Sequence, residues 1–397
     1  MKFASERSKT IKYAIRDLIP LASQLEKKGK KIIRLNIGDP AQFDFEPPNH
    51  LKKALSDAVM DGGYNCYSDS QGLLELRESI CHKELGGGVS LSPENIVVTN
   101  GISEGITLTL GSLCDPGSNL LIPGPVYPPY PVFVRYYGAE VNYYKCDEEN
   151  DWQPDTEELR SSVTDRTKGI LLVNPNNPTG AVYEEKILRE IMDIAGEFSI
   201  PVLSDEIYDR LVFDQKHVST ASLSNDIPVV GFNGFSKGYI ITGWRLGYIY
   251  FHDPAEKIQD LRDAIIRTAR VRLCASTPAQ KAAVAGLEGS QEHIGQMMRK
   301  LRPRRDLAYK RLNEIPGLSC TKPEGAFYVF PKILNRKGAK DDREYVINLL
   351  EETGVLIIHG SGFGEPGRDH FRMVYLAPIP LLNEALDRIS TFMEKDV

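Results

Sequence analysis

The segment GILLVNPNNPTGAVYEEKILREIMDIAGEFSIPVLSDE, residues 169–206, contains two short apolar runs separated by an amphipathic stretch. GILLVNP (169–175) and IPVLSDE (200–206) have the length of buried strands, whereas residues 184–199 repeat apolar side chains at helical spacing. A strand, a helix and a second strand in this order are typical of a parallel β-α-β crossover. The segment therefore predicts an α/β fold with a mainly parallel sheet.

Apolar runs on both sides of this segment extend the predicted sheet to seven strands. The other five strands are predicted at ENIVVTN (94–100), NLLIPGP (119–125), VNYYKC (141–146), PVVGFNGFS (228–236) and RLGYIYF (245–251). A chain of 397 residues is too long for one compact core. Beyond the sheet, a long charged helical stretch (291–313) precedes short strands and another helix (342–353). We expect a large domain over residues 46–285, and a smaller α+β domain with an N-terminal arm over residues 1–45 and 286–397.

The composition is that of a soluble protein, with 41% hydrophobic residues, 26% charged residues and a net charge of −6. A mildly acidic chain without a sustained basic run argues against nucleic acid as its main partner. No apolar run is long enough to cross a bilayer, and residues 1–17 lack the apolar core of a signal peptide, so we expect a cytoplasmic protein. The six cysteines form no CxxC pair and do not cluster with the seven histidines, so the sequence indicates no structural metal.

Polar residues follow the ends of the predicted strands, where ligands of open α/β sheets bind. NPNNPTG (174–180) begins at the end of one strand, Asp205 lies at the end of another with Tyr208 three positions later, Lys237 follows a third, and Arg245 opens the next. Burying a lysine is costly unless its amine is neutralised, paired or used covalently. We expect these side chains to converge on one edge of the sheet.

Together these segments resemble the class I/II aminotransferases, which are fold-type I enzymes dependent on pyridoxal 5′-phosphate (PLP). The resemblance spans nearly the whole chain, through RLNIGDP, YSDSQGLLELRESI, TNGISEGI, PGPVYPPYP, NPNNPTG, SDEIY, FSKGYIITGWRLGY, GSGFGE and HFRMVYLAP. Within this class, LNIGDP, DFEPPNH, DWQPD, DRTKGILLVNPNNPTG and HGSGFGE look closest to the archaeal-type alanine aminotransferases. The implied fold has a large domain with a mainly parallel seven-stranded sheet and a smaller α+β domain.

The resemblance implies roles in catalysis for five residues. Lys237 would form an imine with PLP and later act as the base that moves a proton from the substrate Cα. Asp205 would keep the pyridine nitrogen protonated, while Tyr208 and Asn177 would donate hydrogen bonds to the 3′-oxygen. Tyr127 would stack on the ring. In isolation these positions are also typical of a surface lysine, a helix N-cap, a turn asparagine and an aromatic packed in a proline-rich turn.

The same resemblance implies a phosphate site at a helix start, with a cation beside it. Its members would be Gly101, Ile102, Ser103, Ser236 and Arg245. The chain departs from a common family pattern in one position, because Gly234 stands where a serine usually precedes the lysine by three residues. One phosphate contact is therefore left open.

Other residues are implied in assembly and in substrate binding. Tyr67 resembles a tyrosine that reaches the cofactor phosphate of the neighbouring subunit, which implies a homodimer; a buried core tyrosine is the alternative. The substrate carboxylate would bind Arg372, Asn177 and the backbone of Gly38. For a second substrate carboxylate the chain offers Arg16 or Tyr13, and either also suits the surface of a first helix.

Transamination between L-amino acids and 2-oxo acids is the leading functional prediction, and alanine with 2-oxoglutarate is the pair that the resemblance implies. Aspartate or broad-specificity and aromatic aminotransferases are alternatives, as are PLP-dependent C–S lyases. A regulator with an aminotransferase-like domain is disfavoured because only about forty residues precede the NIGDP motif. The glycines of GFGEPG (362–367) match a dinucleotide fingerprint, but Pro366 and the following strand pattern exclude the helix that such a motif must open.

Overall fold

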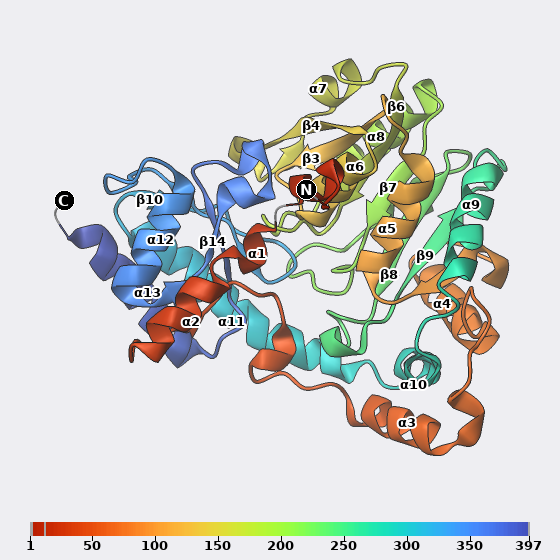
Figure 1. Cartoon of the computed structure of the whole chain (residues 1–397), viewed down its shortest axis with the longest axis horizontal. Helices are drawn as coiled ribbons and strands as arrows, with labels where there is room; N and C mark the ends of the chain where they lie inside the picture. Colours follow the sequence, from red (N-terminus) through yellow and green to blue (C-terminus); the bar gives the residue numbers. More distant parts are fainter. Residues whose placement is uncertain (1–2, 12, 396–397) are drawn as a thin grey trace.

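The computed structural model describes residues 3–11 and 13–395. Its main element is an eight-stranded sheet in the order β2-β9-β8-β7-β6-β3-β4-β5 (Figure 1). β3, β4, β6, β7 and β8 run parallel, whereas β9 is antiparallel to both neighbours and β5 is antiparallel to β4. The strands are β2 (Ile96–Thr99), β3 (Asn119–Gly124), β4 (Glu140–Asp147), β5 (Gln153–Pro154), β6 (Thr167–Val173), β7 (Val202–Asp205), β8 (Val229–Gly234) and β9 (Gly247–His252).

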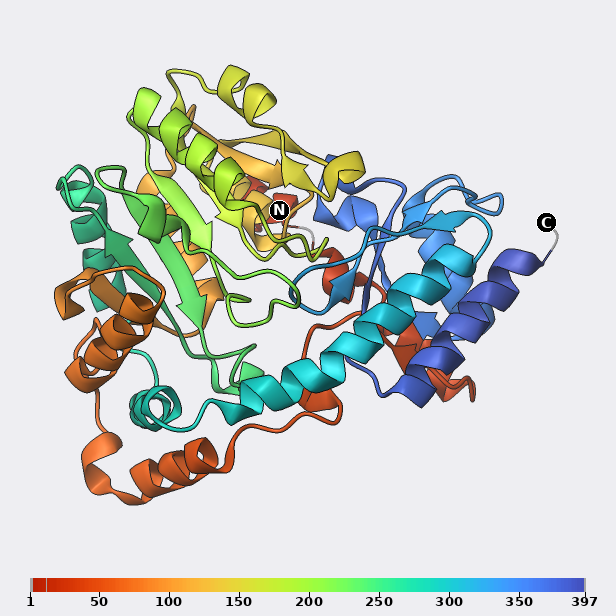
Figure 2. The ribbon, with the colours of Figure 1, turned by 180° about the vertical axis from the view of Figure 1, so that it is seen from behind.

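Helices cover both faces of this sheet because its strands are apolar on both sides. Leu171 and Val173 pack into one core with α5 (Ile102–Leu113), α6 (Pro129–Tyr136) and α9 (Gln259–Val271). Ile170 and Leu172 face the opposite core, with α4 (Leu74–Gly86), α8 (Glu185–Glu197) and α10 (Thr277–Glu288). Figure 1 shows α5 and α6 in front of the sheet, and Figure 2 shows the other face. Two further helices, α3 (Asn49–Met60) and α7 (Thr156–Ser161), lie at the periphery.

The C-terminal part and the N-terminal segment share a third core. Its helices are α1 (Ala14–Asp17), α2 (Ile19–Lys27), α11 (Glu292–Glu314), α12 (Asp342–Thr353) and α13 (Ile379–Glu394). Its strands are β1 (Ile33–Arg34), β10 (Leu318–Ser319), β11 (Tyr328–Val329), β12 (Lys332–Ile333), β13 (Val355–Leu356), β14 (Ile358–His359) and β15 (Phe371–Val374). β1 pairs in parallel with β13, which places the segment after β1 beside the large sheet's carboxyl edge.

All seven predicted strands of the large sheet are confirmed, as are the helices predicted at residues 184–199, 291–313 and 342–353. The eighth strand, β5, was not predicted, because two residues that include a proline are too short to show a period. Within the described residues, no helix is both long enough and apolar enough to cross a membrane. The six cysteines are free thiols. The described residues also contain no group of three or more His, Cys, Asp or Glu side chains arranged to hold a metal ion.

Candidate active site

A cavity of about 170 Å³ lies at the carboxyl ends of β6, β7 and β8. A single water needs only about 10–15 Å³ by this kind of measure, so the cavity has room for a ligand. Most of the residues that the sequence nominated line it. They are Gly38, Ile102, Ser103, Tyr127, Asn177, Asp205, Tyr208, Ser236, Lys237, Arg245 and Arg372.

Four nominated residues need separate description. Gly101 is not a lining residue but caps α5 directly beside Arg245. Tyr67 lies outside the cavity with 77% of its surface exposed. Of the two candidates for a second substrate carboxylate, Tyr13 lines the cavity, whereas Arg16 is exposed and does not.

Lys237 follows β8 and turns its amine toward the N-terminal segment. Its Nζ atom donates a hydrogen bond to the backbone oxygen of Gly38 at 2.7 Å and lies 5.7 Å from the centroid of the Phe327 ring. Burial lowers the pKa of this lysine to about 8, and the positive charges of Arg372 and Arg245 act in the same direction. A substantial fraction of the amine is therefore neutral near physiological pH, which a nucleophile or general base requires.

Asp205 ends β7 with only 3% of its surface exposed. Its Oδ2 atom accepts a hydrogen bond from the Tyr130 hydroxyl at 2.7 Å, and Oδ1 accepts one from the backbone N–H of Ile207 at 3.2 Å. Burial raises the pKa of Asp205 to about 6, although both hydrogen bonds oppose that shift. The carboxylate is thus held in a poorly solvated position where a cationic ligand group would stabilise it.

Arg372 is almost completely buried, with 1% of its surface exposed. Its Nη1 atom donates to Asn177 Oδ1 at 2.8 Å and its Nη2 atom to the backbone oxygen of Asn36 at 2.5 Å. The guanidinium carbon lies 4.4 Å from the centroid of the Tyr328 ring, a cation–π contact. Its Nε atom is buried and makes no hydrogen bond, so the guanidinium retains an unused donor.

The opposite end of the cavity combines a helix start with a cation. Gly101 precedes α5 with a φ of +76°, and a Cβ atom built there would lie 2.4 Å from Nη2 of Arg245. Arg245 itself has a φ of +56° and donates to the backbone oxygen of Thr242 at 2.8 Å. Backbone N–H groups at the start of a helix and an adjacent guanidinium form a site for an anion.

A physical reason explains why glycine, and not the serine of the family pattern, occupies position 234. A Cβ atom at Gly234 would lie 2.9 Å from the Cα of Gly247 and 3.0 Å from the backbone oxygen of Leu246. β8 and β9 approach too closely here for a side chain, so this position has no room for a serine.

The sequence reasoning missed two tyrosines at the site, of which Tyr328 lines the cavity. Tyr328 on β11 contributes a hydroxyl 2.6 Å from that of Tyr208, and Tyr130 holds Asp205. Burial raises the pKa of both Tyr208 and Tyr328, so both hydroxyls stay protonated. The motifs GAFYVFP and PGPVYPPYP contain these residues, but only the three-dimensional structure shows which of their aromatic side chains meet the site.

The carboxyl edge of this mainly parallel sheet brings together a half-buried lysine, a buried carboxylate and two arginines, which matches the aminotransferase pattern. The chain belongs to the aminotransferases of class I and II, because the model of that family matches residues 30–389.

Three relatives refine this assignment. The alanine aminotransferase of Mycobacterium tuberculosis (strain H37Rv) is 39% identical over 378 residues, which cover 94% of this chain and 88% of that protein. The glutamate-pyruvate aminotransferase AlaA of Escherichia coli K12 is 36% identical over 397 residues, covering 98% and 97%. Among solved structures, the alanine aminotransferase from Pyrococcus furiosus is 52% identical and covers 99% of this chain and 100% of its own, with a TM-score of 0.97.

Enzymes of this family depend on PLP, and the residues of the cavity fit that cofactor. The cavity offers an amine of lowered pKa for the aldehyde, a buried carboxylate for the pyridine nitrogen, and a helix start with an arginine for the phosphate. The close approach of Gly101 to Arg245 leaves no space for a side chain at the phosphate end. This protein is therefore a PLP-dependent aminotransferase.

Proposed function

We propose that the enzyme transfers the amino group of L-alanine to 2-oxoglutarate, giving pyruvate and L-glutamate, and catalyses the reverse reaction. The observation that carries this proposal is that Lys237, Asp205 and Arg372 line one cavity. The printed activities of the relatives, alanine and glutamate-pyruvate aminotransferase, support this choice of substrates.

PLP, when bound, supplies an electron-withdrawing ring that stabilises negative charge on the substrate Cα. Lys237 would hold the cofactor, and its Nζ atom would then move the proton from the substrate Cα to the aldehyde carbon of the cofactor. Asp205 would face the pyridine nitrogen and keep it protonated. Tyr208 and Asn177 would donate hydrogen bonds to the 3′-oxygen, and Tyr127 would pack against the ring. The phosphate would bind the backbone of residues 101–103, with Ser236 and Arg245.

Arg372 would bind the substrate α-carboxylate as a two-pronged donor. Asn177 already accepts a bond from Arg372 through Oδ1, so its amide nitrogen is the part that can donate to a ligand. The backbone N–H of Gly38 would complete this subsite. The carbonyl oxygen of the same residue already accepts a hydrogen bond from the Lys237 amine. A Cβ at Gly38 would lie 2.3 Å from the Tyr328 hydroxyl, so a side chain here would displace a wall of the cavity.

The cations among the cavity-lining residues are Lys237, Arg245 and Arg372, and the roles above use all three. The second carboxylate of glutamate would then bind a neutral donor. Tyr13 is the nominated residue that reaches the cavity, so we assign this role to its hydroxyl. A neutral donor also accommodates the methyl group of alanine without leaving a buried charge unpaired.

Absorption spectroscopy tests the proposed substrates. The PLP-loaded protein would be mixed separately with L-alanine, L-glutamate, L-aspartate and L-cystathionine. Loss of the cofactor's visible band with alanine and glutamate, and its return with pyruvate or 2-oxoglutarate, supports the proposal. A faster response to aspartate would favour the aspartate alternative. Release of pyruvate and a thiol from cystathionine, with no 2-oxo acid added as amino-group acceptor, would indicate a C–S lyase.

We further propose a cytoplasmic homodimer in which Tyr67 reaches the phosphate in the neighbouring subunit. Tyr67 is largely exposed in one chain, together with Met60 and Val271, and dimerisation would cover such side chains. Mixing inactive Lys237→Ala protein with impaired Tyr67→Ala protein should restore up to about a quarter of wild-type activity, because each mixed dimer contains one complete site. No recovery after subunit exchange would argue that Tyr67 acts within its own chain, if at all.

A further inference from the structure

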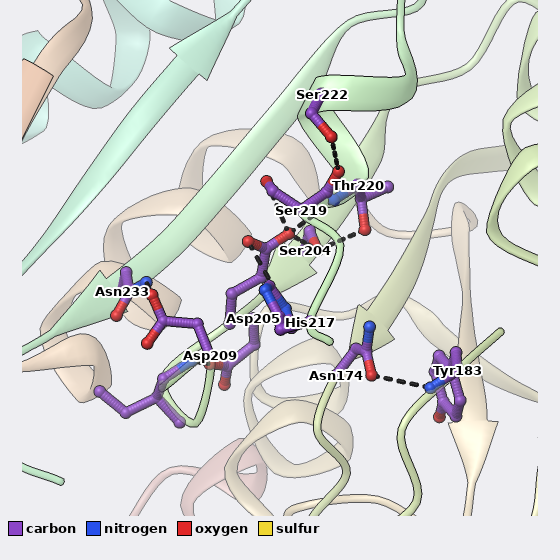
Figure 3. A network of polar contacts seen from close by, with 12 residues as sticks. Asn174, Tyr183, Ser204, Asp205, Asp209, His217, Ser219, Thr220, Ser222 and Asn233 are labelled. Carbon is purple, nitrogen blue, oxygen red and sulfur yellow. Dashed lines mark hydrogen bonds and ion pairs between the residues drawn. The ribbon is translucent and has the colours of Figure 1, made fainter. Parts of the chain in front are cut away.

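The turn that follows β7 has two faces. Asp205 and Tyr208 line the cavity, whereas Glu206 and Asp209 contact polar groups that do not line it. Figure 3 shows Asp205 and Asp209 on this turn. Backbone hydrogen bonds shape the turn, from Glu206 N to Phe232 O at 2.9 Å and from Asp209 N to Glu206 O at 3.0 Å. A short, hydrogen-bonded backbone therefore joins Glu206 and Asp209 to the two residues that face the cavity.

Glu206 anchors the first half of the rear face. It is 1% exposed, and its Oε1 atom accepts bonds from Ser204 Oγ at 2.9 Å, Ser219 Oγ at 3.2 Å and the backbone N–H of Thr220 at 2.9 Å. Its Oε2 atom lies 3.9 Å from Nε2 of His217. Figure 3 shows Ser204, His217, Ser219 and Thr220 gathered in one cluster.

Asp209 anchors the second half. Its Oδ2 atom accepts hydrogen bonds from Lys83 Nζ at 2.6 Å and from Asn233 Nδ2 at 2.9 Å. Lys83 lies on α4 with 10% of its side chain exposed, and its amine also contacts Glu84 Oε1 at 2.9 Å and the Tyr248 hydroxyl at 3.0 Å. One carboxylate oxygen thus joins α4, the turn after β7, and β8.

This connection links the two strands that supply the cavity's reactive groups. Asn233 lies on β8 four residues before Lys237, and Asp209 lies four residues after Asp205. Buried ion pairs contribute little net stability compared with apolar packing of the same shape, because both charges lose their hydration. Apolar side chains at residues 83 and 209 would join the same elements, but they would not fix the direction of approach as hydrogen bonds do.

We infer that Lys83 and Asp209 form a positioning pair, which fixes Asp205 and Tyr208 relative to Lys237. This inference rests on the proposed function, because it assumes that these three residues contact PLP. Neither Lys83 nor Asp209 lines the cavity, so their effect passes through the turn and β8. Removing a residue that holds a ligand-contacting side chain in place typically lowers affinity or activity by about 10–100-fold.

The test compares Asp209→Asn and Lys83→Met with a matched control, Lys332→Met. The control removes a lysine–carboxylate contact of 2.7 Å, to Glu148, far from the turn in sequence. For each protein we would measure PLP affinity by titrating the apoenzyme, the pH midpoint of the bound cofactor's absorbance, kcat/KM, and the melting temperature.

The expected result is that both variants of the pair weaken PLP affinity and kcat/KM by about tenfold or more, and move the absorbance midpoint, while the control does not. If the pair only stabilises the fold, the variants will lower the melting temperature but leave the pH midpoint of the absorbance and the PLP affinity unchanged. That result would overturn the inference. If Lys83→Met does not fold, Asp209→Glu, which keeps the charge but lengthens the side chain, must still shift the midpoint. Failure of the wild-type protein to bind PLP would instead contradict the proposed function.

Discussion

Replacing Asp205 by asparagine should stabilise the apoenzyme at neutral pH while weakening PLP binding. The carboxyl group is 3% exposed, and burial raises its pKa to about 6. The cofactor-free folded protein therefore holds an ionised carboxylate in an unfavourable position at pH 7. An asparagine has nearly the same shape and no charge, so it removes this cost but cannot stabilise a pyridinium nitrogen.

The magnitude follows from the difference between the pKa of Asp205 in the folded chain, about 6, and that of an unfolded aspartate, about 3.9. The folded state binds the proton more tightly, so the stability contributed by this group falls as pH rises from about 4 to about 6. About two pKa units correspond to about 3 kcal/mol above pH 7. The asparagine also weakens the 2.7 Å bond from Tyr130, so we expect a net gain of about 1–3 kcal/mol.

Urea unfolding of the two apoenzymes at pH 4, pH 5.5 and pH 7.5 would measure this difference. The advantage of Asp205→Asn should be absent at pH 4 and largest at pH 7.5. Asp209→Asn is a matched control with the opposite sign. Burial raises the pKa of Asp209, but Lys83, His217 and Arg210 together outweigh it and lower the pKa, so the carboxylate contributes stability above the unfolded pKa. Asp209→Asn should therefore destabilise the protein at pH 7.5 and less so at pH 4.

Two results would refute this reasoning. Equal stability of Asp205→Asn and wild type at pH 7.5 would mean that the carboxylate is solvated or paired in solution. A constant advantage at all three pH values would show that side-chain packing, and not the charge, causes the difference. In PLP titrations, the same variant should lose about 10–100-fold in affinity, the equivalent of one charge-assisted hydrogen bond.

The other predictions concern three parts of the cavity. The rate of PLP uptake by the apoenzyme should rise with pH, with a midpoint at about 8, because burial lowers the pKa of Lys237 to that value. A midpoint near 10 would instead show that the amine is solvated. Gly101→Ala should weaken PLP binding, because the added Cβ would lie 2.4 Å from Nη2 of Arg245. Gly117 also has a positive φ, but no atom lies within 4 Å of a Cβ built there, so Gly117→Ala should lower only the melting temperature. Arg372→Lys should lower kcat/KM for every amino acid substrate by about 100-fold, and an unchanged kcat/KM would remove Arg372 from the carboxylate site.

Local sequence patterns determined the sheet and the identity of its chemically active edge. Each buried strand needs a run of apolar residues, and each crossover helix needs an amphipathic repeat, so seven strands of the large sheet could be predicted from short windows. Lys237 and Asp205 could be placed at one edge for the same reason, because the carboxyl ends of parallel strands meet there. Arg245 lies at that edge because β9, which follows it, is antiparallel to β8. A window-based pattern is blind to a two-residue edge strand such as β5.

Tertiary structure alone decided which distant side chains meet. The Tyr208–Tyr328 contact joins residues 120 positions apart, and the Lys83–Asp209 contact joins residues 126 positions apart. It also decided that Tyr13 lines the cavity while Arg16, three residues later, is exposed. The pKa values of Lys237 and Asp205 belong to the same category, because burial in the assembled structure is their main cause. Burial and long-range contact depend on the packing of the whole chain, and no local stretch of sequence contains that information.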